Sequence, residues 1–263
     1  MDYNFEKSFK PNRRLGQCFL RNRAIAVLES EYGRGKRVVE IGPGFGILTK
    51  ELCSVAQSVV SIEKDSKVYN LVAPTMRFEN LTLLNRDFFD VEYEKLKDPQ
   101  ILISNIPYNI SSRVIEWLSM HNIPAILCMQ KEFVQHMMAT PNSGHYSRLS
   151  VISNLAFKIE KLADVPRGDF YPIPNVDSIV INISPKRKRI SPDEHRIITL
   201  LMSHSSKRLR NSLSDSHAQI GRSKAELRSL ADSMEEGDLR PCEMEPNAIL
   251  EVSKRILKAI PKT

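Results

Sequence analysis

The sequence predicts an α/β protein with a mostly parallel sheet, an antiparallel edge and a small helical domain at its C-terminal end. From Arg37 onward, short β-branched runs alternate with helical stretches, which is typical of a parallel sheet covered by helices on both faces. Two later apolar runs, Val151–Phe157 and Ser178–Ile183, are joined by a Pro-rich loop without a convincing helix, so we expect antiparallel strands there. From Ser191 the chain has helix caps and helical spacing but no clear strand.

The parallel part of the sheet is expected to contain five strands. These are Arg37–Ile41, Val59–Glu63, Leu81–Leu84, Ile101–Ser104 and Ala125–Met129, each an apolar run of the length of a buried strand. The helices that connect or follow them are expected at Ile47–Ala56, Lys67–Met76, Ser112–Met120 and from about Glu132.

A domain boundary is expected at Pro185, which precedes the basic run Lys186–Arg189. We predict one large domain over residues 1–185, with a basic N-terminal arm at residues 1–23, and a helical domain over residues 186–263. The helical domain begins with the capping pattern Ser191-Pro192-Asp193-Glu194, followed by an apolar face at Ile197, Ile198 and Leu201.

Composition favours a soluble globular protein of the cytoplasm. The chain has 263 residues, of which 41% are hydrophobic, and no apolar run is long enough to span a bilayer. Its N-terminus lacks the apolar core of a secretory signal. Without a long apolar run, we expect no membrane association. The four cysteines are widely spaced and none forms a Cys-x-x-Cys pair, so we expect reduced thiols and no metal site.

Two segments hold the positive charge of the chain. The formal net charge is +7, and residues 7–23 and residues 186–210 each carry +6, which leaves −5 for the rest. Segregated basic segments on an otherwise slightly acidic protein are typical of surfaces that bind nucleic-acid phosphates, and a membrane surface is the weaker alternative. The candidate phosphate contacts are Arg13, Arg14, Lys186, Arg187, Lys188, Arg189, Lys207, Arg208 and Arg210.

The tetrapeptide Asn105-Ile106-Pro107-Tyr108 follows the predicted strand Ile101–Ser104, where a parallel sheet opens a crevice. An Asn oxygen and a neighbouring main-chain carbonyl accept the N–H groups of an exocyclic amine and hold its lone pair toward an electrophile. Pro107 stiffens the turn, and Tyr108 offers a face on which a base stacks. The residues therefore suit methylation of a base amine, with an ordinary Asn-x-Pro turn as the alternative.

A glycine loop and two acids are placed to bind a nucleotide-like cofactor. Gly42 and Gly44 lie between the first strand and the first helix, where glycines allow a ligand to approach the backbone. The spacing is G-x-G-x-G, which differs from the dinucleotide fingerprint and speaks against NAD. Glu63 stands at a strand end, where a carboxylate accepts from ribose hydroxyls, and Asp87 is placed to bind an adenine amine; a solvated helix cap is the alternative for each.

Six motifs stand in this order along the chain: Gly16-Gln17-Cys18-Phe19-Leu20, Glu40-Ile41-Gly42-Pro43-Gly44, Asn105-Ile106-Pro107-Tyr108-Asn109-Ile110-Ser111, Gln130-Lys131-Glu132, Arg148-Leu149-Ser150 and Phe170-Tyr171-Pro172-Ile173-Pro174-Asn175-Val176-Asp177-Ser178. Together they resemble the KsgA/Dim-type small-subunit rRNA adenine dimethyltransferases. The resemblance runs from about residue 10 to about residue 215 and implies a Rossmann-like class I methyltransferase fold for residues 1–185.

The resemblance also implies a cofactor, a substrate and site residues. The cofactor is S-adenosylmethionine, contacted by the backbone or the side chains at Cys18, Leu20, Gly42, Gly44, Glu63, Asp87 and Asn105. The family more often has Asn or His where Cys18 stands, so main-chain contact is expected there. The substrate is a pair of adjacent adenosines in the 3′-terminal hairpin loop of small-subunit rRNA, in the immature small subunit. The catalytic residues are Asn105, Ile106, Pro107 and Tyr108, with Phe170 as a second stacking face.

Other functions remain open at this point. A nicotinamide dehydrogenase accounts for the fold alone and is opposed by the glycine spacing. A non-catalytic ribosome-assembly factor accounts for the basic segments and leaves Asn105, Tyr108 and the two acids without a purpose. An adenine N6-methyltransferase acting on another RNA or on DNA shares the tetrapeptide, and only the family resemblance selects small-subunit rRNA.

Overall fold

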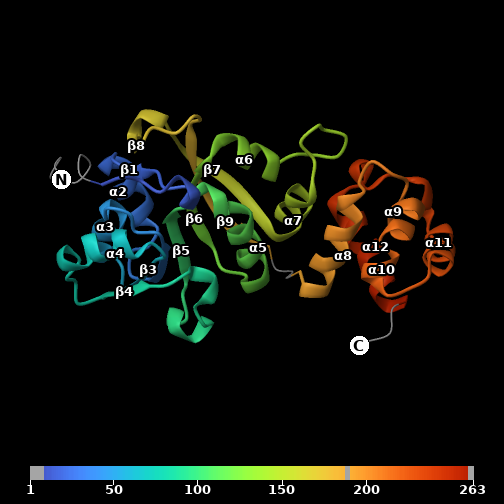
Figure 1. Ribbon diagram of the computed structural model, residues 1–263, viewed down its shortest axis with the longest axis horizontal. Helices are drawn as coiled ribbons and strands as arrows, with labels where there is room; N and C mark the ends of the chain where they lie inside the picture. Colours follow the sequence, from blue (N-terminus) through green and yellow to red (C-terminus); the bar gives the residue numbers. More distant parts are fainter. Residues whose placement is uncertain (1–8, 187–189, 260–263) are drawn as a thin grey trace. The chain divides into compact units, whose positions relative to one another are not determined.

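The computed structural model describes residues 9–186 and 190–259, and Figure 1 shows its helices and strands. A seven-stranded sheet has the order β4-β3-β2-β5-β6-β9-β7. Its strands are β2 (Arg37–Ile41), β3 (Ser58–Glu63), β4 (Leu81–Asn85), β5 (Ile101–Asn105), β6 (Ala125–Gln130), β7 (Phe157–Val165) and β9 (Ser178–Pro185). The five strands expected in the parallel part all form.

Parallel pairing brings the functional strand ends to one edge of the sheet. β2 pairs in parallel with both β3 and β5, and β3 pairs in parallel with β4. Ile41, Glu63 and Asn105 are the last residues of β2, β3 and β5, so their side chains lie at the carboxyl edge, where α/β sheets bind ligands. β9 runs antiparallel to β6, which confirms the expected antiparallel strand.

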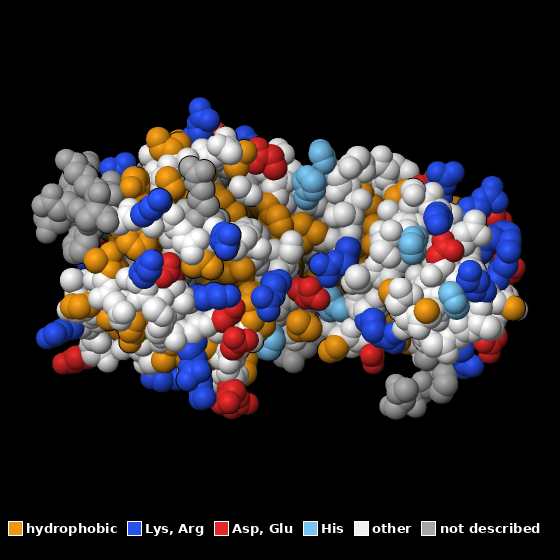
Figure 2. Space-filling model, viewed as in Figure 1, with side chains coloured by type: hydrophobic (Ala, Val, Ile, Leu, Met, Phe, Trp, Pro, Cys, Tyr) orange, Lys and Arg blue, Asp and Glu red, His pale blue; other side chains and the backbone are white. Residues whose placement is uncertain are grey.

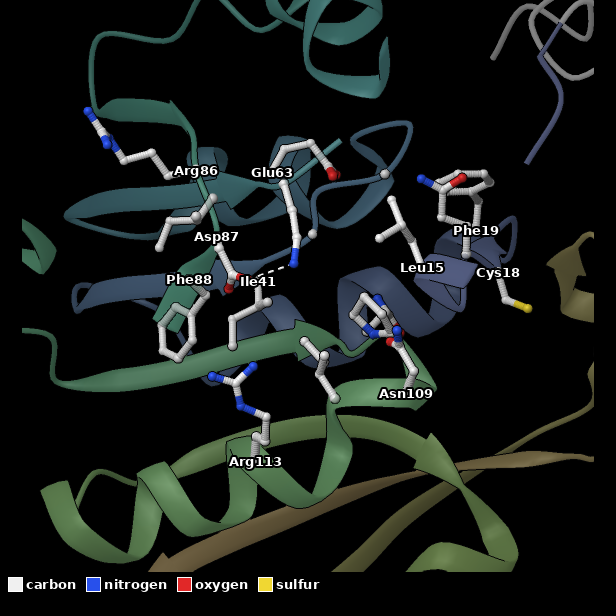
Figure 3. Close-up of a pocket in the computed structure, with 18 residues that line it drawn as sticks. Leu15, Cys18, Phe19, Ile41, Glu63, Arg86, Asp87, Phe88, Asn109 and Arg113 are labelled. Carbon is white, nitrogen blue, oxygen red and sulfur yellow. Dashed lines mark hydrogen bonds and ion pairs between the residues drawn. The ribbon is translucent and has the colours of Figure 1, made fainter. Parts of the chain in front are cut away.

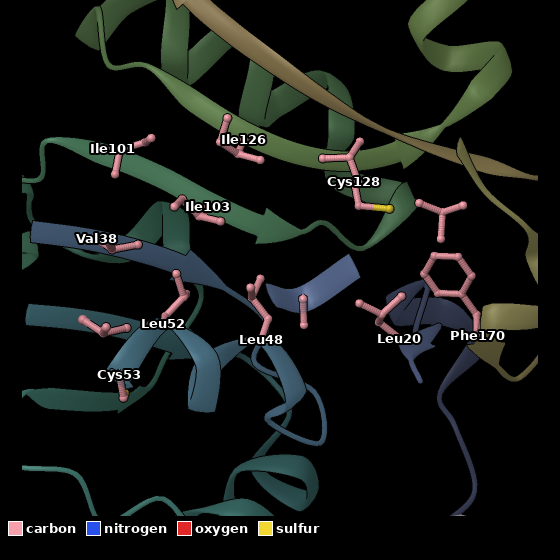
Figure 4. Packing of buried hydrophobic residues seen from close by; sticks show 14 residues of the cluster. Leu20, Val38, Leu48, Leu52, Cys53, Ile101, Ile103, Ile126, Cys128 and Phe170 are labelled. Atoms are coloured by element: carbon pink, nitrogen blue, oxygen red, sulfur yellow. The ribbon is translucent and has the colours of Figure 1, made fainter. Parts of the chain in front are cut away.

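Helices pack against the apolar faces of the strands. They are α2 (Arg23–Glu31), α3 (Ile47–Val55), α4 (Ser66–Val72) and α5 (Ser111–His121). The Asn22 side chain caps α2 by accepting from the Ala24 N–H, and Asp65 caps α4 in the same way through Lys67. Figure 4 shows the core that results, in which Leu48 and Leu52 of α3 lie among Val38, Ile103 and Ile126 of the sheet.

A second, two-stranded sheet joins the N-terminal segment to the Pro-rich loop. β1 (Phe19–Leu20) pairs antiparallel with β8 (Phe170–Tyr171). Leu20 is 4% exposed and Phe170 2% exposed, and both belong to the core of the main sheet. This pairing fixes the chain just before α2 to a segment about 150 residues away in sequence.

One expected strand is a helix. Residues 148–156 form α7 (Arg148–Ala156), and the strand begins only at Phe157, the first residue of β7. Val151, Ile152 and Leu155 are buried at helical spacing, i, i+1 and i+4, but this pattern is short, and the β-branched pair Val151-Ile152 also suits a strand. The Ser147 N–H donates to Ser150 Oγ at 3.0 Å, a helix-start signal that the apolar run masked.

The structure divides into two compact units. Unit 1 comprises residues 1–118, 123–131 and 159–184, and unit 2 comprises residues 119–122, 132–158 and 185–263. Unit 2 therefore includes the stretch 132–158 in addition to the tail from Pro185, whereas the sequence places the boundary at Pro185 alone. The division into independently folding domains at that position stays a prediction.

The tail of unit 2 is helical, as expected. Its helices are α8 (Pro192–Ser203), α9 (Leu209–Asp215), α10 (His217–Ile220), α11 (Lys224–Asp232) and α12 (Pro246–Ala259), which follow α6 (Lys131–Met137) and α7 in chain order. Ser191 and Glu194 form the predicted capping box at the start of α8. Ile197, Ile198 and Leu201 are buried, and α8 packs against α12 and α7.

Candidate active site

A cavity opens at the carboxyl edge of unit 1, bounded by the ends of β2, β3 and β5. It encloses about 770 Å³ of empty space, including the part open to solvent, which is within the usual size of small-molecule sites. Its walls are Leu15, Gln17, Cys18, Phe19, Ile41, Gly42, Gly44, Ile62, Glu63, Lys64, Arg86, Asp87, Phe88, Asn105, Pro107, Asn109, Ile110 and Arg113. In Figure 3, Asp87, Phe88 and Arg113 lie on one side of the cavity and Cys18 on the other.

The loop after β2 forms part of the cavity floor. Gly42 and Gly44 both have left-handed backbone conformations, with φ of 70° and 54°. A Cβ on Gly44 would lie 2.7 Å from Phe19 Cδ1, so the close packing of the N-terminal segment on this loop requires glycine. Gly42 faces Pro107 across the cavity wall and adds no side chain to the space.

Glu63 presents a nearly buried carboxylate to this cavity. Its side chain is at the end of β3, the residue is 7% exposed, and Oε1 accepts the Asp65 N–H at 2.7 Å. Burial raises the pKa of Glu63 to about 7, the charge of Asp65 adds to this, and backbone N–H donors at Asp65, Gly44 and Lys64 oppose it. The carboxylate is therefore held by backbone donors and is suited to accept hydroxyl groups of a ligand.

Asp87 follows β4 and takes part in an ion pair. Its Oδ2 lies 2.7 Å from Lys64 Nζ, the dashed contact in Figure 3, and its Oδ1 accepts the Phe89 N–H at 3.1 Å. Burial alone would raise the pKa of Asp87, but these two donors and the charges of Lys64 and Arg113 outweigh it and lower the pKa. Asp87 is therefore an ionised acceptor at neutral pH.

Asn105 is the last residue of β5, and only one of its two amide atoms has a hydrogen-bond partner. Its Nδ2 donates to Glu29 Oε2 at 3.1 Å, and its Oδ1 is buried without a hydrogen-bond partner. Asn105 and Pro107 both line the cavity, whereas Ile106, 2% exposed, points into the core. The unpartnered Oδ1 can accept a hydrogen bond, and the N–H of a bound amine is a suitable donor for it.

Tyr108 begins the short 3₁₀ turn Tyr108–Ile110 and is half-buried. Its hydroxyl shares a hydrogen bond of 2.8 Å with Ser178 Oγ, which ties the ring to the start of β9. Phe170 lies in the core beside Leu20 and Cys128, so this conformation does not present the ring to solvent. A stacking role for Phe170 stays a prediction, and the burial favours packing.

The N-terminal segment closes one side of the cavity. Gln17 Nε2 donates to Asp65 Oδ2 at 2.8 Å, and Asn109 Nδ2 donates to the main-chain oxygen of Arg14 at 3.1 Å. Cys18 lines the cavity, and burial raises the pKa of its thiol. The Leu20 side chain is turned into the core, where it anchors β1, and contact of its backbone with the cofactor stays a prediction.

Three of the expected RNA-contacting side chains are engaged in ion pairs within unit 2. Lys207 Nζ lies 2.5 Å from Asp215 Oδ2, Arg208 Nη1 lies 3.0 Å from Asp238 Oδ1, and Arg210 also pairs with Asp238. Figure 2 shows acidic side chains among the basic ones on its visible face. The positive charge of this segment is therefore partly neutralised by the protein itself.

Of the remaining basic residues expected to contact RNA, the side chains of Lys186 and Arg14 are described and both are exposed. Lys186 is exposed and donates to the main-chain oxygen of Asn154. Arg14 is exposed near the cavity. Arg187, Lys188 and Arg189 lie outside the described residues, and so does the side chain of Arg13.

Several cavity residues were not predicted from the sequence. Lys64, Asn109 and Arg113 line the cavity, and Glu29 holds Asn105 from behind. Asn109 and Arg113 come four and eight residues after Asn105, and this spacing is the signal that would have found them. Arg113 lies over the Phe89 ring at 3.8 Å, which keeps the guanidinium at the rim.

A model of the ribosomal RNA adenine dimethylase family matches residues 8–244, far more than half of the chain. The chain belongs to the ribosomal RNA adenine dimethylase family. Similar dimethylase-family proteins include a probable ribosomal RNA small subunit methyltransferase A from Methanopyrus kandleri, 33% identical with 95% of this chain and 94% of that protein covered. A protein described in the same words from Thermococcus gammatolerans is 32% identical, with 94% and 90% covered.

Solved structures agree with a class I methyltransferase fold. A dimethyladenosine transferase from Plasmodium falciparum has a TM-score of 0.73 at 24% identity and covers 91% of this chain and 98% of its own. The 23S rRNA methyltransferase ErmE has a TM-score of 0.59 at 22% identity, with 90% and 99% covered. The predicted fold and the predicted enzyme class are thus confirmed, and this member of the dimethylase family is an rRNA adenine dimethyltransferase.

Within residues 9–186 and 190–259, no helix is long and apolar enough to cross a membrane. Over the same ranges, no three His, Cys, Asp or Glu side chains gather as metal ligands.

Proposed function

We propose that this enzyme uses S-adenosylmethionine to dimethylate N6 of two adjacent adenosines in the 3′-terminal hairpin loop of small-subunit rRNA, within the immature small subunit. The observation that carries the methyl-transfer site is the buried, unpartnered Oδ1 of Asn105 at the wall of a nucleotide-sized cavity. The choice of RNA rests on what the curated relatives are named for, small-subunit methyltransferases. The cytoplasmic location stays a prediction.

The cavity residues fit S-adenosylmethionine by the chemistry of their donors and acceptors. Glu63 offers a carboxylate of the kind that accepts the two vicinal hydroxyls of a ribose. Asp87 is an ionised acceptor for an adenine amine, and Phe88 and Ile62 supply apolar wall beside it. Gly42 leaves the backbone accessible where a Cβ would otherwise extend into the cavity. Cys18, Gly44 and Asn105 complete the predicted contacts that line the space.

The chain's own residues orient the reacting amine. When bound, S-adenosylmethionine supplies an electrophilic methyl group: the amine lone pair forms the N–C bond, the C–S electron pair stays on sulfur, and one N–H proton leaves to water. Asn105 Oδ1 accepts an N–H of the target amine and so turns its lone pair toward the methyl. Tyr108, tied to Ser178, offers a fixed ring face to a base taken out of its stack.

Asn105→Ala tests the proposed site, with Tyr108→Ala as its companion. Removing Oδ1 should nearly abolish both methyl transfers, because the acceptor matters most as the amine becomes positive. Removing the ring should slow both transfers and let monomethyladenine accumulate, because a monomethyl amine has one N–H left and depends more on stacking. Mass spectrometry of nucleosides, after reaction with small subunits from cells that lack the enzyme, measures both products.

Asn247→Ala, at an exposed position of α12, makes the same replacement away from the cavity and should leave the rate unchanged. Dimethylation at the normal rate by folded Asn105→Ala would remove this residue from the mechanism. Methylation of large-subunit adenosines, with none in the small subunit, would overturn the proposed substrate.

A further inference from the structure

Glu29 is a charged residue placed where an apolar one would be expected. It lies on α2, whose other buried residues are Ala26 and Ser30, and its own exposure is 0%. A buried carboxyl group is costly unless it is hydrogen-bonded, so its presence in the core calls for a function. In the described part of the chain, its side chain accepts one hydrogen bond, from Asn105 Nδ2 to Oε2, and Oε1 is buried without a partner.

The Glu29 contact decides which way the Asn105 amide faces. Nδ2 donates to Glu29 Oε2 at 3.1 Å. When Glu29 is ionised, a flipped amide would place Oδ1 against the carboxylate, acceptor against acceptor, which leaves both groups unsatisfied. Because Nδ2 is bonded to Glu29, Oδ1 is the Asn105 side-chain atom that is left to bond a ligand. This atom is buried without a hydrogen-bond partner.

We infer that Glu29 is a positioning residue for methyl transfer, holding Asn105 so that Oδ1 accepts the N–H of the target adenine amine. This inference rests on the proposed function of Asn105. A carboxylate that accepts from Nδ2 also polarises the amide, which makes Oδ1 a stronger acceptor as positive charge develops on the amine. Glu29 itself does not touch the substrate and takes no proton from it.

The protonation of Glu29 is coupled to this role. Burial raises its pKa to about 8, the hydrogen bond from Asn105 opposes the rise, and the charge of Glu40 on β2 adds to it. The thiol of Cys128 on β6 is the other titratable group that responds to Glu29. Once protonated, Glu29 loses the charge-assisted bond, and its new O–H competes with the substrate for acceptors nearby. The rate of transfer should therefore rise with pH through about 8, as Glu29 ionises.

Glu29→Gln tests the inference, because glutamine keeps the shape and an acceptor oxygen but cannot ionise. At saturating S-adenosylmethionine and small subunits, we expect the transfer rate at pH 8.5 to fall about tenfold or more, with KM for both substrates within about threefold of the parent. The rise in rate toward pH 8 should disappear. Glu31→Gln, the same change two residues on and exposed, is the matched control and should behave as the parent.

Thermal unfolding separates positioning from support of the fold. Removing a buried ionisable group should leave the unfolding temperature unchanged or raise it at pH 8.5, while the rate falls. A parental rate and pH profile in Glu29→Gln would overturn the inference, and so would a rate that falls only in step with the unfolding temperature. If the parent enzyme methylates no adenine, the proposed function fails instead, and the two failures are thereby distinguished.

Discussion

At the scale of single residues, we expect Glu63 to make the affinity of the cavity for its cofactor depend on pH. Ribose hydroxyls donate best to an ionised carboxylate, and the pKa of Glu63 is raised to about 7, chiefly by burial. We therefore expect the affinity for S-adenosylmethionine to fall as the pH drops below 7. Glu63→Ala should weaken binding by about 1.5–3 kcal/mol, or roughly ten- to hundredfold, at pH 8.

Calorimetric titration of each variant at pH 6 and pH 8 measures this effect. Glu63→Gln should bind weakly at both values, because its amide does not titrate, and Glu79→Gln, exposed and outside the cavity, should match the parent. Parental affinity in a folded Glu63→Ala variant would contradict the assignment of this residue to the cofactor.

Sequence reasoning found the residues whose position at a strand end carries information. Glu63, Asp87 and Asn105 stand at or just beyond successive strands, and the parallel register brings all three to one cavity. Glu29 was missed because Glu-Ser-Glu in a helix resembles a solvated face, and its burial depends on how α2 packs. Leu20 and Phe170 were assigned to the site by resemblance, and the β1–β8 pairing turns both into the core.

At the scale of elements, we expect the basic side chains just before and at the start of α9 to set how strongly unit 2 binds RNA. Lys207, Arg208 and Arg210 are paired with Asp215 and Asp238, yet such exposed pairs contribute only about 0–1 kcal/mol, so RNA phosphates compete for them easily. Replacing all three by Ala should weaken RNA binding and reduce the slope against log salt by up to about three. Asp238→Asn should strengthen binding, because it removes the carboxylate that Arg208 and Arg210 share, while Arg210 keeps its pair with Asp232.

Fluorescence anisotropy with labelled rRNA hairpin over a salt series measures both variants. Cofactor affinity is the internal control, since the cavity is formed by unit 1 residues. An unchanged slope in the triple variant, together with unchanged binding by Asp238→Asn, would mean that the ion pairs serve the packing of unit 2 alone.

Element prediction from the sequence succeeded where the apolar pattern had a recognisable period or length. The strands β2 to β6 are short β-branched runs between helical stretches, and each formed where expected. The failure at α7 has another cause: the helical spacing of Val151, Ile152 and Leu155 is short, and it contains two β-branched residues that also suit a strand. The burial of Ser150 and Ser153 in unit 2 cannot be seen in the local sequence.

At the scale of the whole molecule, the buried acids of unit 1 predict how stability responds to pH. Burial raises the pKa of Glu40 to about 7, opposed by hydrogen bonds from Ser61 and Thr49, and Glu29 and Glu63 are raised as well. A pKa above that of the unfolded chain means that the folded state binds the proton more tightly. The stability due to these groups is therefore complete below about pH 4.5 and is lost as the pH rises through 7 to 8.

The size and the location of this loss are both measurable. For Glu40 the change from 4.5 to about 7 corresponds to about 3 kcal/mol. Trp117, the one tryptophan of the chain, lies in unit 1 with its ring 4.9 Å from that of Phe88, so its fluorescence follows the unfolding of this unit. Urea unfolding without cofactor should give a free energy of unfolding that decreases from pH 5 to pH 8.

Glu40→Gln isolates one group, because the Gln oxygen still accepts from Ser61 Oγ and Thr49 Oγ1, which donate to Glu40 Oε2 at 2.7 Å in the parent. The variant should be less dependent on pH than the parent and more stable than it at pH 8, since it no longer ionises in the core. A parental free energy of unfolding that stays level or increases from pH 5 to pH 8 would show that these carboxyls ionise without cost. Their burial in unit 1 would then be weaker than the structure indicates.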